Sequence, residues 1–223
     1  MPVTARQRAE RREVAESRER ILTAAETYFA ERTVDAPLNE LIRRSGVSPA
    51  TFYRRFPTGD DLMRALYDRF AARFDALFDS IDGEESGWSG ISAAIAGTIA
   101  IVRDSPILAP VMTRMMEIDP DYRPGQRWVA PVEELTARAQ AEGAMRKDVT
   151  GFDVVLAPLA VASLAAFPQP ISTVLLDRVH GILLDGFQAT DARPLDARTG
   201  IDPEAFHRAI HGQDSRRAPA SDS

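Results

Sequence analysis

A stretch of eighteen residues, LNELIRRSGVSPATFYRR at 38–55, constrains the fold of this chain more than any other feature. Its first apolar residues have the i, i+3, i+4 spacing of one helical face: Leu38, Leu41 and Ile42. Gly46 ends this helix, because glycine readily adopts the left-handed conformation of a C-cap. Ser48 is a favourable N-cap, and Pro49 suits the first turn of a following helix, where its missing N–H costs nothing. The stretch therefore predicts two short helices, 38–45 and 48–55, around a tight turn.

The second of these helices carries side chains that suit a nucleic acid. Thr51, Tyr53 and Arg54 can hydrogen-bond to phosphates or base edges, and the guanidinium of Arg54 matches the two acceptors of guanine. The same residues could be ordinary surface positions of a small helix. A short connection with glycine in the turn is typical of a helix-turn-helix, which favours the DNA-binding interpretation.

Residues 18–66 resemble the DNA-binding domain of tetracycline-repressor-like (TetR) transcriptional regulators. Three segments carry the resemblance: RERILTAAETYFAER (18–32), LNELIRRSGVSPATFYRRF (38–56) and DDLMRAL (60–66). The most specific is the pattern S-G-V-S-x-x-T-F-Y-x-x-F, from Ser45 to Phe56. The resemblance implies an all-α fold, with an N-terminal three-helix helix-turn-helix domain and a C-terminal helical ligand-binding and dimerisation domain. No strand-like alternation recurs along the chain, which agrees with an all-α fold.

The resemblance also implies roles for individual residues. It gives Tyr53 a phosphate contact and leaves Ala50, Thr51 and Arg54 as the best candidates for base edges. The full predicted DNA-binding set is Arg43, Ser48, Pro49, Ala50, Thr51, Tyr53 and Arg54. The family commonly has a phosphate-contacting lysine where Gly59 stands here, and Arg54 or Arg55 could replace it. Arg43 could equally belong to a solvated helix face.

Charge is distributed unevenly along the chain. The formal net charge is −6, but residues 1–56 hold 11 arginines against 8 acidic residues, so the first quarter is net +3 and the remainder −9. This asymmetry fits a basic end that approaches DNA and an acidic body that DNA repels. Residues 1–16 are predicted to be a flexible basic arm, solvated in the free protein and following the DNA backbone or minor groove once bound.

Changes in composition and the positions of helix-breaking residues predict how the rest of the chain is organised. The helix-turn-helix domain is expected at 17–66, the ligand-binding and dimerisation domain at 67–190, and a disordered tail at 191–223. The expected helices are 17–32, 38–45, 48–55, 59–79, 91–102, 107–118, 127–142, 151–166 and 171–189. Pro158 predicts a kink inside 151–166.

Two features of the larger domain suggest how it is used. A group of methionines and aromatic residues is predicted to form the wall of a pocket for a small apolar ligand, although such residues are more often core: Met112, Met115, Met116, Trp128 and Phe152. The last two helices carry more apolar residues than one chain can bury, which predicts a homodimer interface: Leu156, Leu159, Val174, Leu175, Val179, Ile182, Leu183 and Phe187.

Several function classes lack their sequence signals. The chain has no cysteine, no apolar run of the ~18 residues that a membrane span requires, and no secretory signal, so we expect a cytoplasmic protein without a membrane partner. It also lacks a phosphate-binding glycine loop and the common hydrolase and zinc motifs, so we expect no catalytic residues and no cofactor. Glu204, His207 and His211 share one face if their segment is helical and could bind a metal, but a solvated tail is the stronger interpretation.

The sequence thus predicts a one-component transcriptional regulator. We expect a repressor that binds palindromic operator DNA as a homodimer and is released by a small apolar ligand. An all-α enzyme and a ligand-independent DNA-binding protein are the alternatives.

Overall fold

The computed structural model describes residues 5–81, 83, 85–189 and 195. Within these ranges the chain forms helices and connecting turns, and no strand is present. A single isolated antiparallel bridge pairs Met145 with Gln188. The all-α prediction is therefore confirmed.

The chain divides into two compact units. The N-terminal unit comprises residues 1–70 and 107–115, and the C-terminal unit comprises 71–106 and 116–223. One boundary falls inside helix α4 (Gly59–Ile81) and another inside α6 (Leu108–Ile118). That the first part of α6 joins the N-terminal unit could not be predicted, because helix partners are set by tertiary packing rather than by local pattern.

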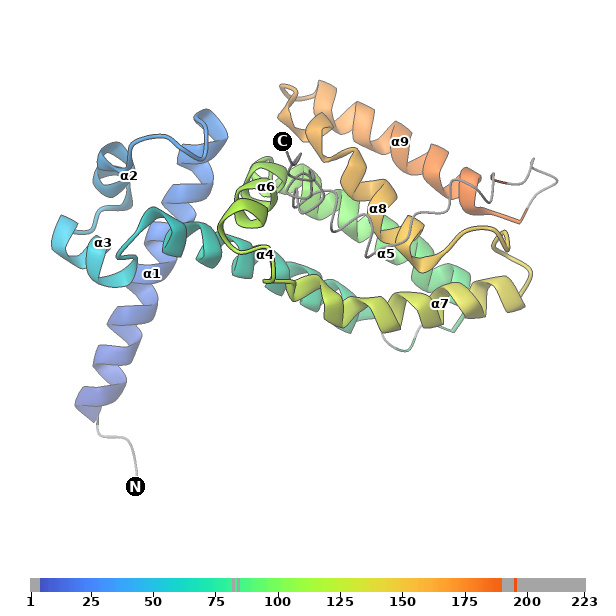
Figure 1. The fold of residues 1–223 in the computed structure, drawn as a ribbon, viewed down its shortest axis with the longest axis horizontal. Helices are drawn as coiled ribbons and strands as arrows, with labels where there is room; N and C mark the ends of the chain where they lie inside the picture. Colours follow the sequence, from blue (N-terminus) through green and yellow to red (C-terminus); the bar gives the residue numbers. More distant parts are fainter. Residues whose placement is uncertain (1–4, 82, 84, 190–194, 196–223) are drawn as a thin grey trace, which may run out of the picture. The chain divides into compact units, whose positions relative to one another are not determined.

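Three helices build most of the N-terminal unit (Figure 1). Helix α1 (Ala5–Glu31) packs against α2 (Leu38–Ser45) and α3 (Pro49–Arg55). The buried side chains between them and the start of α4 are mostly large and apolar: Ile21, Leu22, Tyr28, Phe29, Leu41, Ile42, Phe52, Phe56, Leu62 and Leu66. Burial of each contributes about 1.5–3 kcal/mol, so this small core suffices to hold the three helices together.

Helix α1 begins twelve residues before the start that the sequence predicted, at Ala5 rather than Ser17. The described part of the predicted flexible arm is thus helical. Residues 5–16 consist mainly of alanine, arginine, glutamate and glutamine, which are strong helix formers. Arg12 and Glu16, one helical turn apart, also form an ion pair at 2.6 Å.

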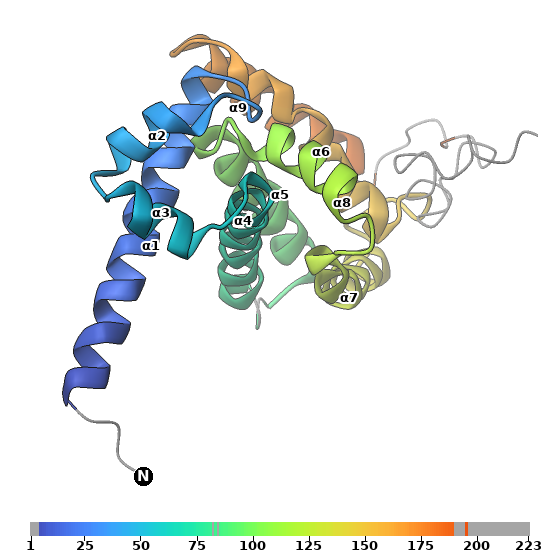
Figure 2. The ribbon, with the colours of Figure 1, turned by 60° about the vertical axis from the view of Figure 1, so that its left-hand side comes forward.

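The C-terminal unit is a helical bundle around α5 (Gly87–Asp104), which packs against α7 (Val129–Ala141), α8 (Gly151–Ala160) and α9 (Ile171–Phe187) (Figures 1 and 2). The side chains that α5 buries are mainly aliphatic: Ile91, Ala94, Ile95, Ile99 and Val102. A short 3-10 helix, η1 (Pro124–Trp128), leads directly into α7. This unit therefore has an apolar core of its own.

The predicted kinked helix at 151–166 is instead two elements. Helix α8 ends at Ala160, and the 3-10 helix η2 (Ala162–Ala166) follows it. Pro158 lies inside the last turn of α8, where it has no N–H to donate and crowds the preceding turn. The proline thus shortens the α-helix rather than only bending it.

No single helix within the described residues is long and apolar enough to cross a membrane. The bent pair α5 and α6 passes that test only when its two helices are taken together.

Candidate nucleic-acid interface

The turn between α2 and α3 has the local structure that the sequence predicts. Gly46 caps α2 in the left-handed conformation (φ 66°), and its N–H donates to the carbonyl of Arg43 at 3.3 Å. Ser48 is the N-cap of α3, where its Oγ accepts the N–H of Thr51 at 3.1 Å, and Pro49 occupies the first turn. The side chain of Arg43, in the last turn of α2, is exposed.

Helix α3 buries one side and presents the other to solvent. Phe52 is fully buried and meets Phe56 edge-on, with ring centroids 6.2 Å apart. Tyr53 is 47% exposed, and Arg54 is exposed beside it. The other predicted DNA-binding residues of the turn and of α3 are also accessible: Ser48, Pro49 and Ala50 are exposed, and Thr51 is half-buried.

Three polar side chains follow one another along this accessible side. Ser48, Thr51 and Arg54 stand three residues apart, and the Oγ1 of Thr51 accepts from the Oγ of Ser48 at 3.0 Å. An Nη2 of Arg54 donates to the same Thr51 oxygen at 3.5 Å. The result is a row of two hydroxyls and a guanidinium, groups that bond to phosphates and to base edges.

The C-terminal end of α3 is tied to α1. The Nε of Arg55 donates to the Oγ of Ser17 at 2.9 Å, and that hydroxyl donates to the carbonyl of Val14 at 2.9 Å. The guanidinium of Arg18 lies 4.9 Å from the centroid of the Phe56 ring. Of the two arginines expected to replace the missing lysine contact, Arg55 is thus held against α1, which leaves Arg54 as the exposed one.

The opposite end of the domain is held by Arg44. Its guanidinium donates to Glu31 and Glu40, each at 2.7 Å, and lies 5.4 Å from the centroid of the Tyr28 ring. These hydrogen bonds lower the pKa of Glu40 and raise that of Arg44. The hydroxyl of Tyr28 donates to the carbonyl of Pro37 at 2.8 Å. Arg44 therefore fixes α2 on α1.

Residues 21–66, which include α2, α3 and the start of α4, match the sequence profile of the bacterial regulatory proteins of the tetR family. The matched part of the chain is a tetR-family DNA-binding domain. No curated protein matches the chain. Proteins with this domain are transcriptional regulators, which is the function class of this chain.

Solved structures of TetR-family regulators share this fold. A TetR transcriptional regulator from Streptomyces coelicolor has 26% sequence identity, with 78% of this chain and 99% of that chain covered and a TM-score of 0.57. A TetR regulatory protein from Mycobacterium vanbaalenii has 24% identity, covering 80% and 98% with a TM-score of 0.54. A ketosteroid transcriptional regulator from Mycobacterium tuberculosis is 15% identical, covering 77% and 94% with a TM-score of 0.60.

The residues predicted to line a ligand pocket are divided between the two units of the chain. Met112 and Met115 belong to the N-terminal unit, where Met115 is buried. Met116, Trp128 and Phe152 belong to the C-terminal unit. Sequence order alone could not separate them, because the boundary falls within a single helix.

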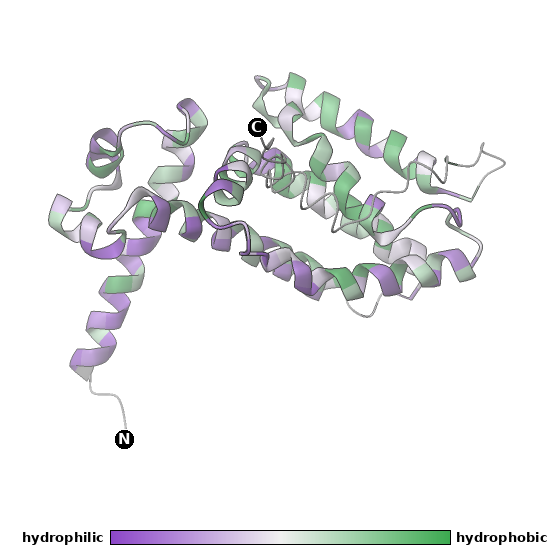
Figure 3. Ribbon diagram, viewed as in Figure 1, coloured by the Kyte–Doolittle hydropathy of each residue, from purple (hydrophilic) through white to green (hydrophobic). Residues whose placement is uncertain are grey.

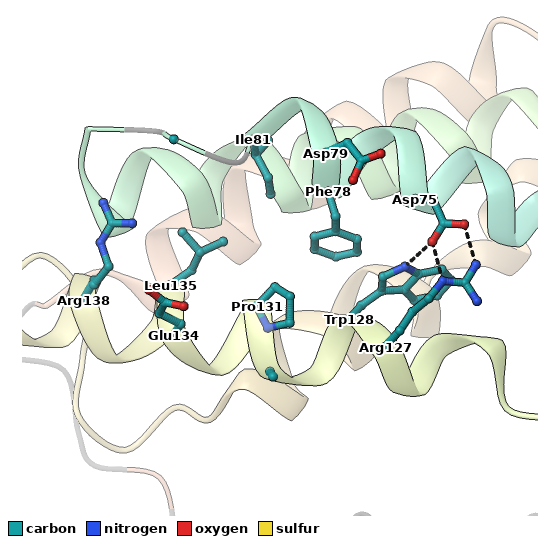
Figure 4. A pocket seen from close by; sticks show the side chains of 12 residues that line it. Asp75, Phe78, Asp79, Ile81, Arg127, Trp128, Pro131, Glu134, Leu135 and Arg138 are labelled. Atoms are coloured by element: carbon teal, nitrogen blue, oxygen red, sulfur yellow. Dashed lines mark hydrogen bonds and ion pairs between the residues drawn. The ribbon is translucent and has the colours of Figure 1, made fainter.

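A pocket of about 510 Å³ lies in the C-terminal unit between the end of α4 and α7 (Figure 4). The residues that line it are Asp75, Phe78, Asp79, Ile81, Gly83, Arg127, Trp128, Ala130, Pro131, Glu134, Leu135 and Arg138. Trp128 is the one residue of the predicted pocket wall among them. Its ring stacks on Phe78, with centroids 5.8 Å apart, and its Nε1 donates to Asp75 at 2.8 Å.

Polar groups also enter this pocket. Asp75 accepts hydrogen bonds from the guanidinium of Arg127 as well as from Trp128, and those from Arg127 are the main cause of its lowered pKa. Sequence reasoning missed Asp75, Phe78 and Arg127, since residues some fifty positions apart carry no local signal of their contact. The pocket thus combines an aromatic wall with a charged rim.

Metal-binding groups are not gathered in the described part of the chain, where no cluster of three or more histidine, cysteine, aspartate or glutamate residues could hold an ion. Glu204, His207 and His211 lie outside the described residues.

Proposed function

We propose that this regulator is a repressor that binds palindromic operator DNA as a homodimer and leaves it when a small apolar ligand binds. The observation that carries the proposal is the accessible side of α3, with Tyr53, Arg54 and the hydroxyls of Ser48 and Thr51. The opposite side of α3 is anchored by Phe52, so the recognition surface is held on a rigid core. Rigid placement of base-reading groups is what specific DNA recognition needs.

Dimerisation follows from the limited reach of one recognition helix. Two copies related by a two-fold axis present recognition helices to successive major grooves, about 34–36 Å apart or a multiple of that distance. Helix α9 supports this part of the proposal, because Ile171, Val174 and Ile182 are 52%, 63% and 59% exposed. The three residues share one helical face, and a face of exposed aliphatic side chains is typical of an interface. Phe187, by contrast, is buried within its own chain.

The ligand is proposed to bind in the C-terminal unit. Trp128 and Phe78 provide an aromatic wall there, and the pocket volume of about 510 Å³ suits a small organic molecule. Such a ligand releases DNA only if it binds the released state more tightly than the DNA-bound state. Because α4 runs through both units, a change at its C-terminal half has a covalent route to the DNA-binding domain.

Selection from randomised duplexes tests the DNA part of this proposal. The purified full chain is expected to enrich a palindrome whose half-sites lie a whole number of helical turns apart. Enrichment of no sequence, or of single half-sites, would contradict it.

The selected duplex then serves to test the ligand part of the proposal. Apolar compounds that raise the melting temperature of the protein are expected to release the duplex. Compounds that stabilise the protein and leave its DNA affinity unchanged would instead support the ligand-independent alternative.

A further inference from the structure

The pocket between the end of α4 and α7 has more negative than positive groups in its lining. Its ionisable side chains are three carboxylates and two guanidiniums: Asp75, Asp79, Glu134, Arg127 and Arg138. The guanidinium of Arg127 is held by Asp75. That of Arg138 donates to the backbone carbonyl of Glu85 at 3.3 Å. Both guanidiniums of the lining are therefore already engaged within the chain.

Two carboxylates of the lining, by contrast, have no partner. Within the described part of the chain, neither Asp79 nor Glu134 forms a hydrogen bond or an ion pair. Asp79 belongs to α4 and Glu134 to α7, the two helices that face each other across the pocket (Figure 4). Their charges are thus available, from two walls, to a molecule that enters the pocket.

The same pocket offers aromatic and apolar surface. Figure 3 shows hydrophobic and hydrophilic residues mixed along both α4 and α7. Phe78 stacks on Trp128, with ring centroids 5.8 Å apart, and the other apolar side chains of the lining are Ile81, Ala130, Pro131 and Leu135. A ligand that fits this lining needs an apolar body as well as a charge.

The chain itself shows how this wall receives a cation. The guanidinium carbon of Arg127 lies 5.1 Å from the centroid of the Trp128 ring, while its nitrogens donate to the carboxylate of Asp75. Aromatic faces attract cations because their π electrons give them a negative potential. One carboxylate and one aromatic ring thus already bind a positive group at the edge of the pocket.

We propose that the pocket selects an organic cation with an aromatic body. The proposal rests on the proposed function, which places the ligand in this pocket, and adds the charge of that ligand. The aromatic body packs on Phe78 and Pro131, and the ammonium or guanidinium group meets Asp79 and Glu134. Unpaired charges of one sign along a cleft also raise the local concentration of ions of the opposite sign. An anion of the same size is repelled by the two carboxylates and finds both guanidiniums engaged.

Three probes with one ring system test the choice of charge. (Naphthylmethyl)trimethylammonium, naphthylmethanol and naphthylacetate are positive, neutral and negative, and a pocket of about 510 Å³ accommodates each of them. Isothermal titration calorimetry with the full chain measures their affinities. We expect the cation to bind about three- to tenfold more tightly than the alcohol, because the carboxylates are exposed, and the anion to bind most weakly. High salt should reduce the difference, since it screens exposed charges.

Two double variants with the same change in charge locate the site. Asp79→Asn with Glu134→Gln keeps the shape of the pocket and should bring the affinity for the cation close to that for the alcohol. Asp104→Asn with Asp121→Asn removes two exposed carboxylates of the same unit that do not line the pocket, and should keep the parental preference. An unchanged affinity for the neutral alcohol in both variants confirms that they are folded.

The outcomes separate this inference from the proposed function. If the alcohol binds as tightly as the cation, or if both double variants lose the same preference, the inference is wrong and the pocket can still serve an apolar ligand. If none of the probes binds, the inference fails together with the proposed ligand site. If the cation is preferred through Asp79 and Glu134 but leaves the selected duplex bound, the inference holds and the proposed release by a ligand fails.

Discussion

Arginine side chains in the N-terminal unit take roles that depend on their tertiary surroundings. Arg44 joins α2 to α1 through two carboxylates, and Arg55 joins α3 to α1 through Ser17, whereas Arg54 stays exposed. In the sequence, Arg54 and Arg55 were both candidates to replace the missing lysine contact with phosphate. The distinction could not be predicted, because the partner of Arg55 lies 38 residues away and no local pattern reports a contact at that distance.

Asp75 allows a prediction about pH. Its pKa is lowered in the folded protein, chiefly by hydrogen bonds from Arg127. The ionised group therefore stabilises the fold above the unfolded-state pKa of about 3.9, and this contribution disappears as pH falls through the lower folded-state value. Because the Asp75 side chain is 38% exposed, the contribution at pH 7 is expected to be about 1 kcal/mol or less.

We therefore expect Asp75→Asn to lower the melting temperature at pH 7 and the difference from the parent to shrink below pH 4. Thermal unfolding followed by circular dichroism between pH 3 and pH 7 measures this. Asp79→Asn, at an exposed carboxylate of the same helix, is the control and should change little. If Asp75→Asn lowers the melting temperature by the same amount at every pH, Asp75 stabilises the fold through packing or neutral hydrogen bonds rather than through its charge.

At the scale of helices, the boundaries set by capping and turn residues could be predicted. The start of α1 and the end of α8 differ from the prediction. The limits of α2 and α3 follow from Gly46, Ser48 and Pro49, whose preferences act within a few residues. The early start of α1 was missed because a polar segment without an apolar face resembles a disordered one. The early end of α8 reflects the full cost of Pro158, which the sequence analysis treated as a kink only.

The contact between α5 and α7 allows a prediction about stability. A Cβ added to Gly87 would lie 2.3 Å from the backbone nitrogen of Ala139 and 2.7 Å from the carbonyl carbon of Arg138, and backbone atoms cannot move aside. We expect Gly87→Ala to destabilise the protein by about 1–3 kcal/mol, as overpacking does. Chemical denaturation measures the change.

Gly97→Ala is the matched control within the same helix. Its added Cβ would meet the side chain of Leu77, whose far end can change rotamer. The loss there is therefore expected to be smaller than for Gly87→Ala. If Gly97→Ala lowers the free energy of unfolding more than Gly87→Ala does, the contact of α5 with the α7 backbone is less rigid than its close packing indicates.

At the scale of the whole molecule, the proposed dimer depends on the exposed face of α9. We expect Val174→Glu with Ile182→Glu to produce a monomer at micromolar concentration in light scattering, because two buried charges per chain oppose association. Val129→Glu places a charge at another exposed apolar residue, 54% exposed on α7, and should leave the mass unchanged. A double variant that keeps the parental mass would place the interface elsewhere.

The central claim is that α3 reads DNA, and fluorescence anisotropy with the selected duplex tests it most directly. Tyr53→Ala should weaken binding to every duplex, because it removes a phosphate contact. Arg54→Ala should lose about 1–3 kcal/mol and tolerate substitution at one base pair of each half-site. Arg20→Ala, at an exposed arginine outside α3, is the control for charge. Parental affinity and parental sequence preference in both α3 variants would contradict the account.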